Sequence, residues 1–346
     1  MAQKKVLLIK TGGTVCQERD EHNVLRPTHR EYLDLVLGLH DLAEVTVRSF
    51  LPIDSTNMTT SYRADIARLL YDQHAAYDGF VLVHGTDSLV DTAAAFNYML
   101  HNFGKPVVLT GSQIPIFDPR TDAINNIYHA VQTATLDLGE IVISFGKQIL
   151  RGNRSIKISE EGFDAFYSPR VAPLGEVNTK IHLSGHRIGR YRRKPSLFVD
   201  FDTGVEVYRQ TSGTSSKGFS LLAHDPDVHG IVFSAFGAGN IRADLLPILQ
   251  QAVSSGKPVA VVTNCLEGTA EMGVYEVGAD AIRAGAFPVE DMTLEAAVQK
   301  MMYALGKAHQ DHLSGNELLT FVQDEMRYTE YARDITPAKR PELVVS

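Results

Sequence analysis

The sequence has little cysteine, no long apolar run and no excess of positive charge, and each shortage excludes a class of protein. Cys16 and Cys265 are the only cysteines in 346 residues, too few for a disulfide framework or a zinc site built from thiolates. No apolar run approaches the roughly 18 residues that a membrane-spanning helix needs. The 33 basic and 41 acidic residues give a net charge of -8, which argues against a surface built for nucleic acid or anionic lipid.

What remains is typical of a globular protein of the cytoplasm that acts on small molecules. Hydrophobic residues make up 44% of the chain, enough for a sizeable core, and 346 residues exceed the usual limit for one core, so we expect two domains. The opening stretch MAQKKVLLIK runs into TGGT and not into a small-residue cleavage site. We interpret it as the first strand and not as a signal peptide.

The order of apolar runs predicts an α/β fold. Short β-branched runs alternate with stretches of helical spacing, a rhythm that favours a mainly parallel sheet flanked by helices. We expect a larger N-terminal α/β domain over residues 1–190, an irregular linker over 191–217 and a smaller C-terminal α/β domain over 218–346. The runs predicted as strands are Val6–Ile9, Val45–Leu51, Phe80–Val83, Val107–Leu109, Ile141–Ser144, Ile231–Phe233 and Val259–Thr263.

Polar residues follow three of these strands, where the carboxyl ends of a parallel sheet bind ligands. The loops read TGGT, DSTN and HGTDS, and they begin at Thr11, Asp54 and His84. Each has an ordinary explanation as a turn or a helix cap, with Thr59 or Thr60 opening one helix and Ser88 capping another. Taken together, the loops would bring two threonine hydroxyls and a carboxylate to one cleft.

A threonine hydroxyl needs a base before it becomes a nucleophile. Asp87 is adjacent in sequence, but a solvated aspartate is a weak base, and a desolvated lysine would serve better. Lys157 lies in the segment RGNRSIK, and we expect like-charge repulsion from Arg151 and Arg154 to favour its neutral form. The ordinary alternative is a solvated lysine on a loop.

Four separated motifs, KTGGTV, VHGTDSL, LTGSQIP and RGNRSIKISEEGFDAFYSP, resemble those of the bacterial asparaginase family, most closely its cytoplasmic type I branch. The resemblance extends from about Lys5 to at least Gly306 in the same order and spacing. It implies hydrolysis of the side-chain amide of L-asparagine to aspartate and ammonia, with no metal and no organic cofactor. By their motif positions, Thr14 matches the nucleophile, and Thr86, Asp87 and Lys157 match a second triad.

The resemblance also implies how the substrate is bound. Ser55 and Thr56 match the segment that contacts the amino-acid carboxylate, and Asp87 would also accept from the substrate ammonium. Backbone N–H groups of the glycine-rich loops, including Gly85, would hold the oxyanion. Asn240 matches a polar residue that the second domain offers to a neighbouring subunit's site, which implies a homodimer or homotetramer.

One departure from the family pattern bears on activity. The family has a tyrosine on a mobile lid about ten residues after the nucleophile, and the matching place here is near Val24. The next tyrosine is Tyr32, expected on the following helix. Losing a proton-transfer group typically costs on the order of 10²–10⁴ in rate. Either Glu21 or His22 substitutes, or the enzyme is weak, or its substrate differs.

Two smaller departures lie in the same loops. Cys16 stands where the family has a small residue, and Ser88 where its motif has a second threonine. We interpret Cys16 as a small packed hydrophobe. Ser88 keeps a hydroxyl.

Other features favour no further site. His309 and His312 have helical spacing, but without a carboxylate or cysteine near them in sequence we expect no metal site. The basic run HRIGRYRRK suggests an RNA contact, and amide hydrolysis is also the ammonia-generating step of transfer-RNA amidotransferases with an asparaginase-like domain. Since we see no added N-terminal domain and the chain is acidic, we interpret the run as a solvated linker. Two functions stay open: an L-asparagine amidohydrolase with weaker action on glutamine, and a weakly active or non-catalytic amino-acid sensor.

Overall fold

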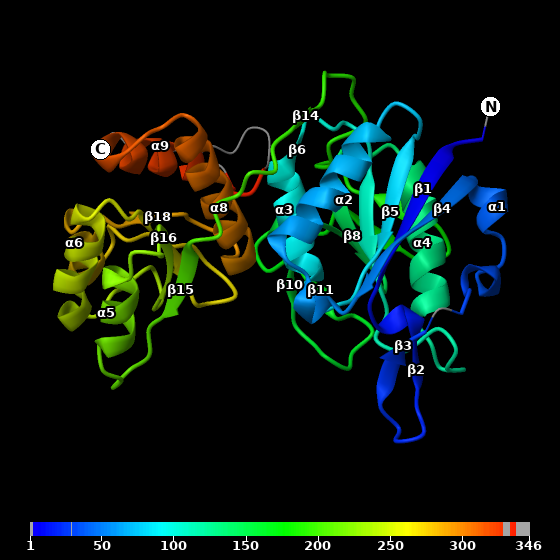
Figure 1. Cartoon of the computed structure of the whole chain (residues 1–346), viewed down its shortest axis with the longest axis horizontal. Helices are drawn as coiled ribbons and strands as arrows, with labels where there is room; N and C mark the ends of the chain where they lie inside the picture. Colours follow the sequence, from blue (N-terminus) through cyan, green and yellow to red (C-terminus); the bar gives the residue numbers. More distant parts are fainter. Residues whose placement is uncertain (1–2, 29, 328–332, 337–346) are drawn as a thin grey trace, which may run out of the picture. The chain divides into compact units, whose positions relative to one another are not determined.

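The computed structural model describes residues 3–28, 30–327 and 333–336. The chain divides into two compact units, Met1–Phe201 and Asp202–Ser346 (Figure 1). The boundary falls inside the segment 191–217, which also contains two strands, β14 (Ser196–Leu197) and β15 (Val205–Arg209). Each unit is described by itself below.

The first unit holds an eight-stranded sheet in the order β13-β12-β9-β8-β7-β5-β1-β4. Its strands are β1 (Lys5–Gly12), β4 (Glu44–Ile53), β5 (Gly79–Val83), β7 (Val107–Thr110), β8 (Ile141–Phe145), β9 (Gln148–Arg151), β12 (Gly175–Val177) and β13 (Ile181–Leu183). Shorter pairs are β2 (Gln17–Arg19) with β3 (Leu25–Pro27), β6 (Leu100–His101) with β14, and β10 (Ile156–Lys157) with β11 (Phe166–Tyr167). The α-helices are α1 (Leu39–Leu42), α2 (Thr60–Asp72), α3 (Leu89–Met99) and α4 (Ala123–Thr135). The 3-10 helices are η1 (Thr14–Cys16), η2 (Leu33–Leu35), η3 (Ser55–Asn57) and η4 (Gly152–Arg154).

The five strands β4, β1, β5, β7 and β8 are mutually parallel, and the remaining three extend the sheet in antiparallel fashion. The chain passes from β1 to β4 on one side and then returns to β5 on the other side. The order of the sheet therefore reverses between β1 and β5. In open α/β sheets, ligands bind in the crevice beyond the carboxyl ends of the strands at such a switch point.

Alternating side chains explain why helices cover both faces of this sheet. Val6, Leu8, Val81 and Val83 are fully buried and pack with the α4 residues in one core cluster. The residues between them, including Leu7 and Leu82, are equally buried and point to the opposite face. Helices α2 and α3 lie over that face and α4 over the first (Figure 1). Buried on both sides, these strands read as the continuous apolar runs seen in the sequence.

The basic run HRIGRYRRK is solvated mainly in its last part, where Arg192, Arg193 and Lys194 are exposed. Arg190 donates to the carbonyls of Leu136 at 2.7 Å and Ala134 at 2.8 Å, and Arg187 pairs with Asp137 at 3.2 Å. Burial lowers the pKa of Arg190. The expectation was wrong for Arg187 and Arg190 because the sequence cannot show the helix-end carbonyls and the carboxylate of the first unit that these side chains bind.

The second unit contains a four-stranded parallel sheet in the order β15-β16-β17-β18. The strands after β15 are β16 (Gly230–Ala235), β17 (Val259–Thr263) and β18 (Phe287–Pro288), and the helices are α5 (Lys217–His224), η5 (Ala243–Leu245), α6 (Leu246–Ser254), α7 (Glu276–Arg283), α8 (Leu294–Gln310) and α9 (Gly315–Arg327). Phe219, Phe233 and Leu249 are fully buried in its core cluster. Within the described ranges, none of the helices combines the length and apolar character needed to span a bilayer.

Candidate active site

The loops that follow β1 and β5 meet in direct backbone contact. A Cβ atom placed on Gly13 would lie 2.3 Å from Gly85 Cα, and one placed on Gly85 would lie 2.5 Å from Ser55 Oγ. Gly13 also has φ 77° and ψ -175°, a conformation that is essentially restricted to glycine. The three loops identified in the sequence therefore do converge, and glycine is required where they touch.

Lys157 joins the loop after β5 through its side chain. Its Nζ donates to Thr86 Oγ1 at 2.8 Å and to Asp87 Oδ1 at 2.6 Å. Thr86 is buried and the Lys157 side chain is 19% exposed, whereas that of Asp87 is 62% exposed. The structure thus brings together the three residues predicted as a triad, with the lysine between the hydroxyl and the carboxylate.

The charged neighbour of Lys157 differs from the expected one. The sequence predicts repulsion from nearby arginines, but Arg151 is directed to Glu140, with N–O distances of 2.5 and 3.2 Å in a buried pair. Lys157 instead contacts the Asp87 carboxylate. The two-residue pairing of β10 with β11, in which Lys157 lies opposite Phe166, holds the lysine in place.

Thr14 opens the 3-10 helix η1 and is partly exposed. It follows Gly13 directly, as Thr86 follows Gly85, so the backbone contact of the two glycines brings both threonine-bearing turns to the same switch point. Cys16 is buried in the same helix, where its Sγ donates to Gly13 O at 3.4 Å. Burial raises the pKa of the Cys16 thiol, in agreement with its interpretation as a packed residue.

Ser55 and Thr56, in the loop after β4, lie beside Asp87, which is in the loop after β5. Ser55 Oγ accepts the Asp87 N–H at 3.3 Å, and Thr56 Oγ1 donates to Asp87 Oδ2 at 3.5 Å. Ser88 occupies the N-cap position of α3 but makes no capping bond, because its hydroxyl donates to Ser55 O at 2.5 Å. The cap predicted for Ser88 was therefore wrong. The cap predicted for Thr59 is confirmed, since its hydroxyl accepts from Tyr62 N–H at 3.3 Å.

A buried hydrogen-bond chain behind the site was missed by the sequence analysis. His84 Nδ1 lies 2.7 Å from Gly85 O, His84 Nε2 lies 3.1 Å from Thr92 Oγ1, and Arg63 Nε donates to Thr92 Oγ1 at 3.1 Å. A carbonyl only accepts, so Nδ1 carries the proton and Nε2 accepts from the Thr92 hydroxyl. Burial lowers the pKa of His84 to about 4. A histidine within the apolar run VLVHG was the available signal.

The segment after Thr14 forms the β2–β3 hairpin, which protrudes at the foot of the first unit in Figure 1. Glu21 and His22 lie at its tip with side chains 86% and 76% exposed, and Val24 is 49% exposed. Asp20 closes the turn by accepting the N–H groups of His22 and Val24 at 2.9 Å. The place expected for the lid tyrosine is thus on an exposed hairpin.

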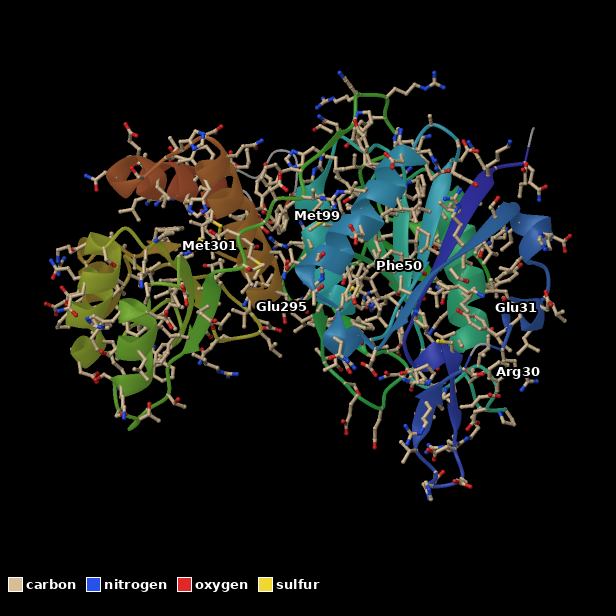
Figure 2. All side chains as sticks on the ribbon, viewed as in Figure 1. Arg30, Glu31, Phe50, Met99, Glu295 and Met301 are labelled. Carbon is tan, nitrogen blue, oxygen red and sulfur yellow. The ribbon has the colours of Figure 1, made fainter. Side chains whose placement is uncertain are left out.

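Tyr32 is not on this hairpin but just before η2. In the chain it follows Arg30 and Glu31, which Figure 2 labels. It is 2% exposed and lines a cavity of about 100 Å³ together with Gly12 and Cys16. In the described part of the chain, its buried hydroxyl has no hydrogen-bond partner. Burial raises the pKa of Tyr32 far above its ordinary value.

Asn240 belongs to the second unit, in the turn after β16. Its backbone forms an isolated bridge with Phe236, and its carbonyl accepts from the Gln210 side chain. Its side-chain Oδ1 is buried and lacks a hydrogen-bond partner among the described residues.

His309 does have a carboxylate neighbour, contrary to the sequence analysis. Its Nδ1 lies 2.9 Å from Oδ2 of Asp202, which also contacts His229 Nδ1 at 2.8 Å. These three residues form a group that could hold a metal ion, whereas His312 is outside it. The sequence could not show this because the partners are far from His309 along the chain.

Comparisons with known proteins agree with this fold in both units. The N-terminal asparaginase family model matches residues 5–188, and the glutaminase/asparaginase C-terminal domain model matches residues 204–313. The chain is 33% identical over 307 residues to an L-asparaginase of Thermococcus kodakarensis, covering 87% of this chain and 93% of that protein. It is 32% identical over 323 residues to L-asparaginase 1 of Escherichia coli K12, covering 89% and 93% of the two chains.

A solved structure shows the same likeness in three dimensions. The crystal structure of L-asparaginase I from Vibrio cholerae superposes with a TM-score of 0.86 at 30% identity, covering 97% of this chain and 100% of that chain. The family models together match most of both units, and the relatives align over most of their own length. The chain therefore belongs to the asparaginase family.

Proposed function

We propose that this protein hydrolyses the side-chain amide of L-asparagine to L-aspartate and ammonia, with Thr14 as nucleophile. The observation that carries the proposal is the bonding of Lys157 to both Thr86 and Asp87 at 2.8 and 2.6 Å, beside the turn that contains Thr14. A binding protein has no need for a lysine held between a hydroxyl and a carboxylate next to a second threonine. An amidase needs such a group to move protons.

In the first step, Thr14 Oγ bonds to the amide carbon and the C–N bond breaks. The Thr14 hydroxyl proton passes to the departing nitrogen, so ammonia leaves and an ester with Thr14 remains. In the second step, water supplies OH to the acyl carbon and a proton to Thr14 Oγ, which releases aspartate. Thr86 and Lys157 lie where they relay these protons, and Asp87 holds Lys157 against Thr86.

Substrate recognition falls to the groups around Asp87. The exposed Asp87 carboxylate accepts from the substrate ammonium, while Ser55 and Thr56 contact the substrate carboxylate. Backbone N–H groups at Gly85 and its neighbours face the developing oxyanion. Glutamine differs from asparagine by one methylene, worth about 1–3 kcal/mol in a pocket, so we expect weak glutaminase activity.

The assembly proposed is a homodimer or homotetramer in the cytoplasm. The buried Asn240 Oδ1 without a described partner supports a role for this side chain at a contact with another subunit. The two free cysteines, Cys16 and Cys265, fit a reducing compartment.

The test is release of ammonia from L-asparagine, L-glutamine and D-asparagine by the purified protein. We expect Thr14→Ala and Thr86→Val each to reduce release from L-asparagine by at least about 10²-fold. Thr46→Val on the edge strand β4 is the matched control and should retain full activity. Unchanged turnover in the Thr14→Ala variant would refute the assigned nucleophile.

The second candidate is an amino-acid sensor on the same fold. It is favoured by the β2–β3 hairpin, where no tyrosine occurs between Thr14 and Tyr32. A sensor would release no ammonia above background, yet L-asparagine or L-aspartate would raise its melting temperature. The same preparation and the same variants decide between the two functions.

A further inference from the structure

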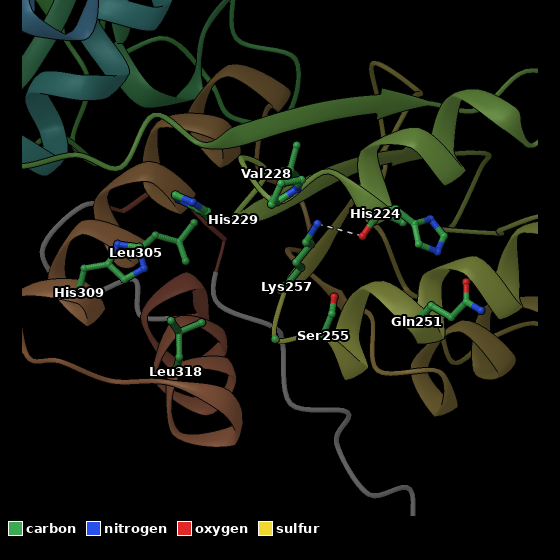
Figure 3. A pocket seen from close by; sticks show the side chains of 12 residues that line it. His224, Val228, His229, Gln251, Ser255, Lys257, Leu305, His309 and Leu318 are labelled. Atoms are coloured by element: carbon green, nitrogen blue, oxygen red, sulfur yellow. Dashed lines mark hydrogen bonds between the residues drawn. The ribbon is translucent and has the colours of Figure 1, made fainter.

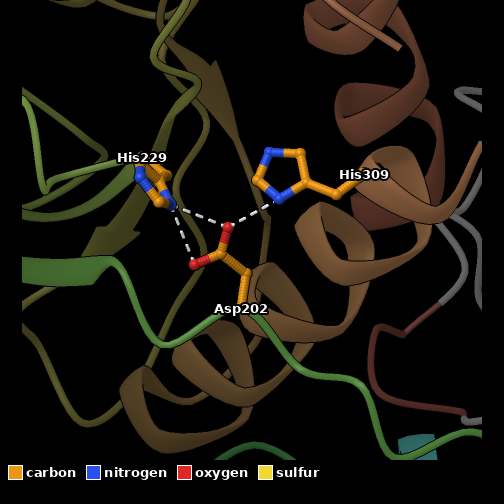
Figure 4. A group of neighbouring side chains, drawn as sticks. All are labelled: Asp202, His229 and His309. Carbon is orange, nitrogen blue, oxygen red and sulfur yellow. Dashed lines mark hydrogen bonds and ion pairs between the residues drawn. The ribbon is translucent and has the colours of Figure 1, made fainter. Parts of the chain in front are cut away.

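We infer that Asp202, His229 and His309 in the second unit bind a divalent transition-metal ion of the zinc type. One ligand atom from each residue lies within 4.8 Å of the other two. His229 and His309 approach the Asp202 carboxylate from opposite sides, each through Nδ1 (Figure 4). Their rings are 5.6 Å apart, centroid to centroid, and steeply inclined at 77°. This inference is independent of the proposed function, whose residues lie in the first unit.

The carboxylate is held in place by the backbone around it. Gly204 N–H donates to Asp202 Oδ1 at 2.7 Å, and Asp202 N–H donates to Met302 O in α8 at 2.9 Å. The His229 N–H donates to Gly204 O at 2.6 Å, which brings the start of β16 to the same point. The backbone donor fixes Oδ1, and Oδ2 contacts both imidazoles, although His229 Nδ1 also lies 3.0 Å from Oδ1. Such outer contacts are what orient metal ligands in proteins.

The spacing is close to that of a bound ion. Zinc bonds of about 2.0–2.1 Å at a tetrahedral angle place neighbouring ligand atoms about 3.3 Å apart. The observed Nδ1–Oδ2 distances are 2.8 and 2.9 Å, each within about 0.5 Å of that spacing. The three ligand atoms lie within 4.8 Å of one another, so the imidazoles must move to enclose an ion. The His229 and His309 side chains are 44% and 46% exposed, which leaves them room for this movement. A bound ion would take the place of the protons that lie between each histidine Nδ1 and the Asp202 carboxylate.

The donor set selects the class of metal. Two imidazoles and one carboxylate suit zinc and its first-row neighbours, whereas magnesium and calcium prefer sites made only of oxygen. Three protein ligands leave at least one position for water or another small ligand. His229 and His309 also line a cavity of about 440 Å³ (Figure 3).

The other charged groups of this cavity do not compete for the site. Lys257 also lines the cavity (Figure 3), but its ammonium donates to the carbonyls of Ala223 at 2.9 Å and Asp225 at 2.5 Å. His224 bonds to Ser220 O of its own helix at 2.7 Å through Nδ1. His224 is therefore a control that shares the cavity but not the site.

The test is binding of Co²⁺ and Zn²⁺ to the full chain after treatment with chelator, in a Cys265→Ser background that removes the exposed thiol. We expect one Co²⁺ per chain, with visible d–d absorption that Zn²⁺ displaces. His229→Gln and His309→Gln should each weaken binding by at least about 10-fold, a loss typical of removing a group that supports the metal. His224→Gln should bind as the parent does.

A stability measurement keeps the result interpretable if a variant folds poorly. Zn²⁺ should raise the melting temperature of the parent and of His224→Gln, but not that of His309→Gln, with all three equally stable in chelator. Absence of saturable binding to the parent overturns the inference. So does binding that survives in both His229→Gln and His309→Gln, or that is lost equally in His224→Gln, because the ion would then lie elsewhere.

Discussion

Lys157 Nζ lies 2.8 Å from Thr86 Oγ1, although 71 positions separate the two residues in the chain. The contact joins the crest of the loop after β5 to the short β10–β11 pair, and Asp87 completes it from the exposed side. Lys157 therefore contacts the Thr86 hydroxyl, which relays protons in the proposed reaction. The following expectations depend on this relationship and on the loops around it.

Replacing the lysine should abolish catalysis without unfolding the protein. We expect Lys157→Met to lower kcat for L-asparagine by about 10²–10⁴, the usual contribution of a positioned proton-transfer group. Lys147→Met is the control, since Lys147 is exposed in the turn between β8 and β9. Steady-state kinetics with circular dichroism would check both variants. Equal activity of the two would remove Lys157 from the mechanism.

A tyrosine placed on the hairpin should improve the enzyme. Val24 is 49% exposed on the β2–β3 hairpin and matches the place of the family's lid tyrosine. We expect Val24→Tyr to raise kcat by about tenfold or more, toward the range that acid–base groups supply. Val24→Phe supplies the ring without the hydroxyl and should have no such effect. If both variants behave alike, the missing hydroxyl does not limit the rate.

The buried His84 should make stability depend on pH. Its pKa is held at about 4 in the folded chain, against about 6.5 for a free histidine. As the pH falls below about 6.5, the unfolded chain takes up a proton that the folded chain refuses until about pH 4, so the folded state loses about 3 kcal/mol over this range.

Urea unfolding between about pH 7 and about pH 4 would measure this loss. His84→Gln cannot titrate, and the difference in unfolding free energy between the parent and this variant should therefore shrink as the pH falls. A difference that stays constant with pH would mean that the folded and unfolded chains bind the His84 proton equally, so that burial does not lower its pKa.

The contact between the loops after β1 and β5 should tolerate no side chain. Gly13 and Gly213 have nearly the same positive φ, 77° and 76°, but a Cβ on Gly13 meets Gly85 at 2.3 Å and a Cβ on Gly213 meets nothing within 4 Å. Gly213→Ala should therefore cost only the conformational strain, about 1–2 kcal/mol. Gly13→Ala should cost more and also lower kcat, because the two threonine-bearing turns are pushed apart. Thermal unfolding and steady-state kinetics of both variants would check this, since Gly213→Ala reports the backbone strain alone and Gly13→Ala reports the strain together with the clash against Gly85.

The pattern of the sequence was sufficient for the sheet and for the loops at its carboxyl edge. Continuous apolar runs predicted β5 and β7, and polar residues directly after β1, β4 and β5 predicted a shared cleft, because parallel strands end at one edge. The family motifs identified Thr86, Asp87 and Lys157 as a group, and the structure brings them together. Each of these signals lies within one short stretch of the chain, so it can be recognised from the sequence alone.

Predictions failed where a side chain found a partner far along the chain. Ser88 was expected to cap α3 but binds Ser55 O, and Arg190 was expected in solvent but binds carbonyls at the end of α4. His309 looked isolated until Asp202 came within 2.9 Å. The hydrogen-bonding capacity of each residue could be read in advance, but its partner could not.

The sequence by itself determined the α/β class, the order of the strands, the glycine turns and the chemical groups present at the site. Only the tertiary structure decided the order in which strands lie in the sheet, the placement of Lys157 between Thr86 and Asp87, and the meeting of Asp202, His229 and His309. The physical reason is the range of the forces involved. Periodicity and turn chemistry act between neighbours in sequence, whereas a site is made by packing that joins residues the chain holds far apart.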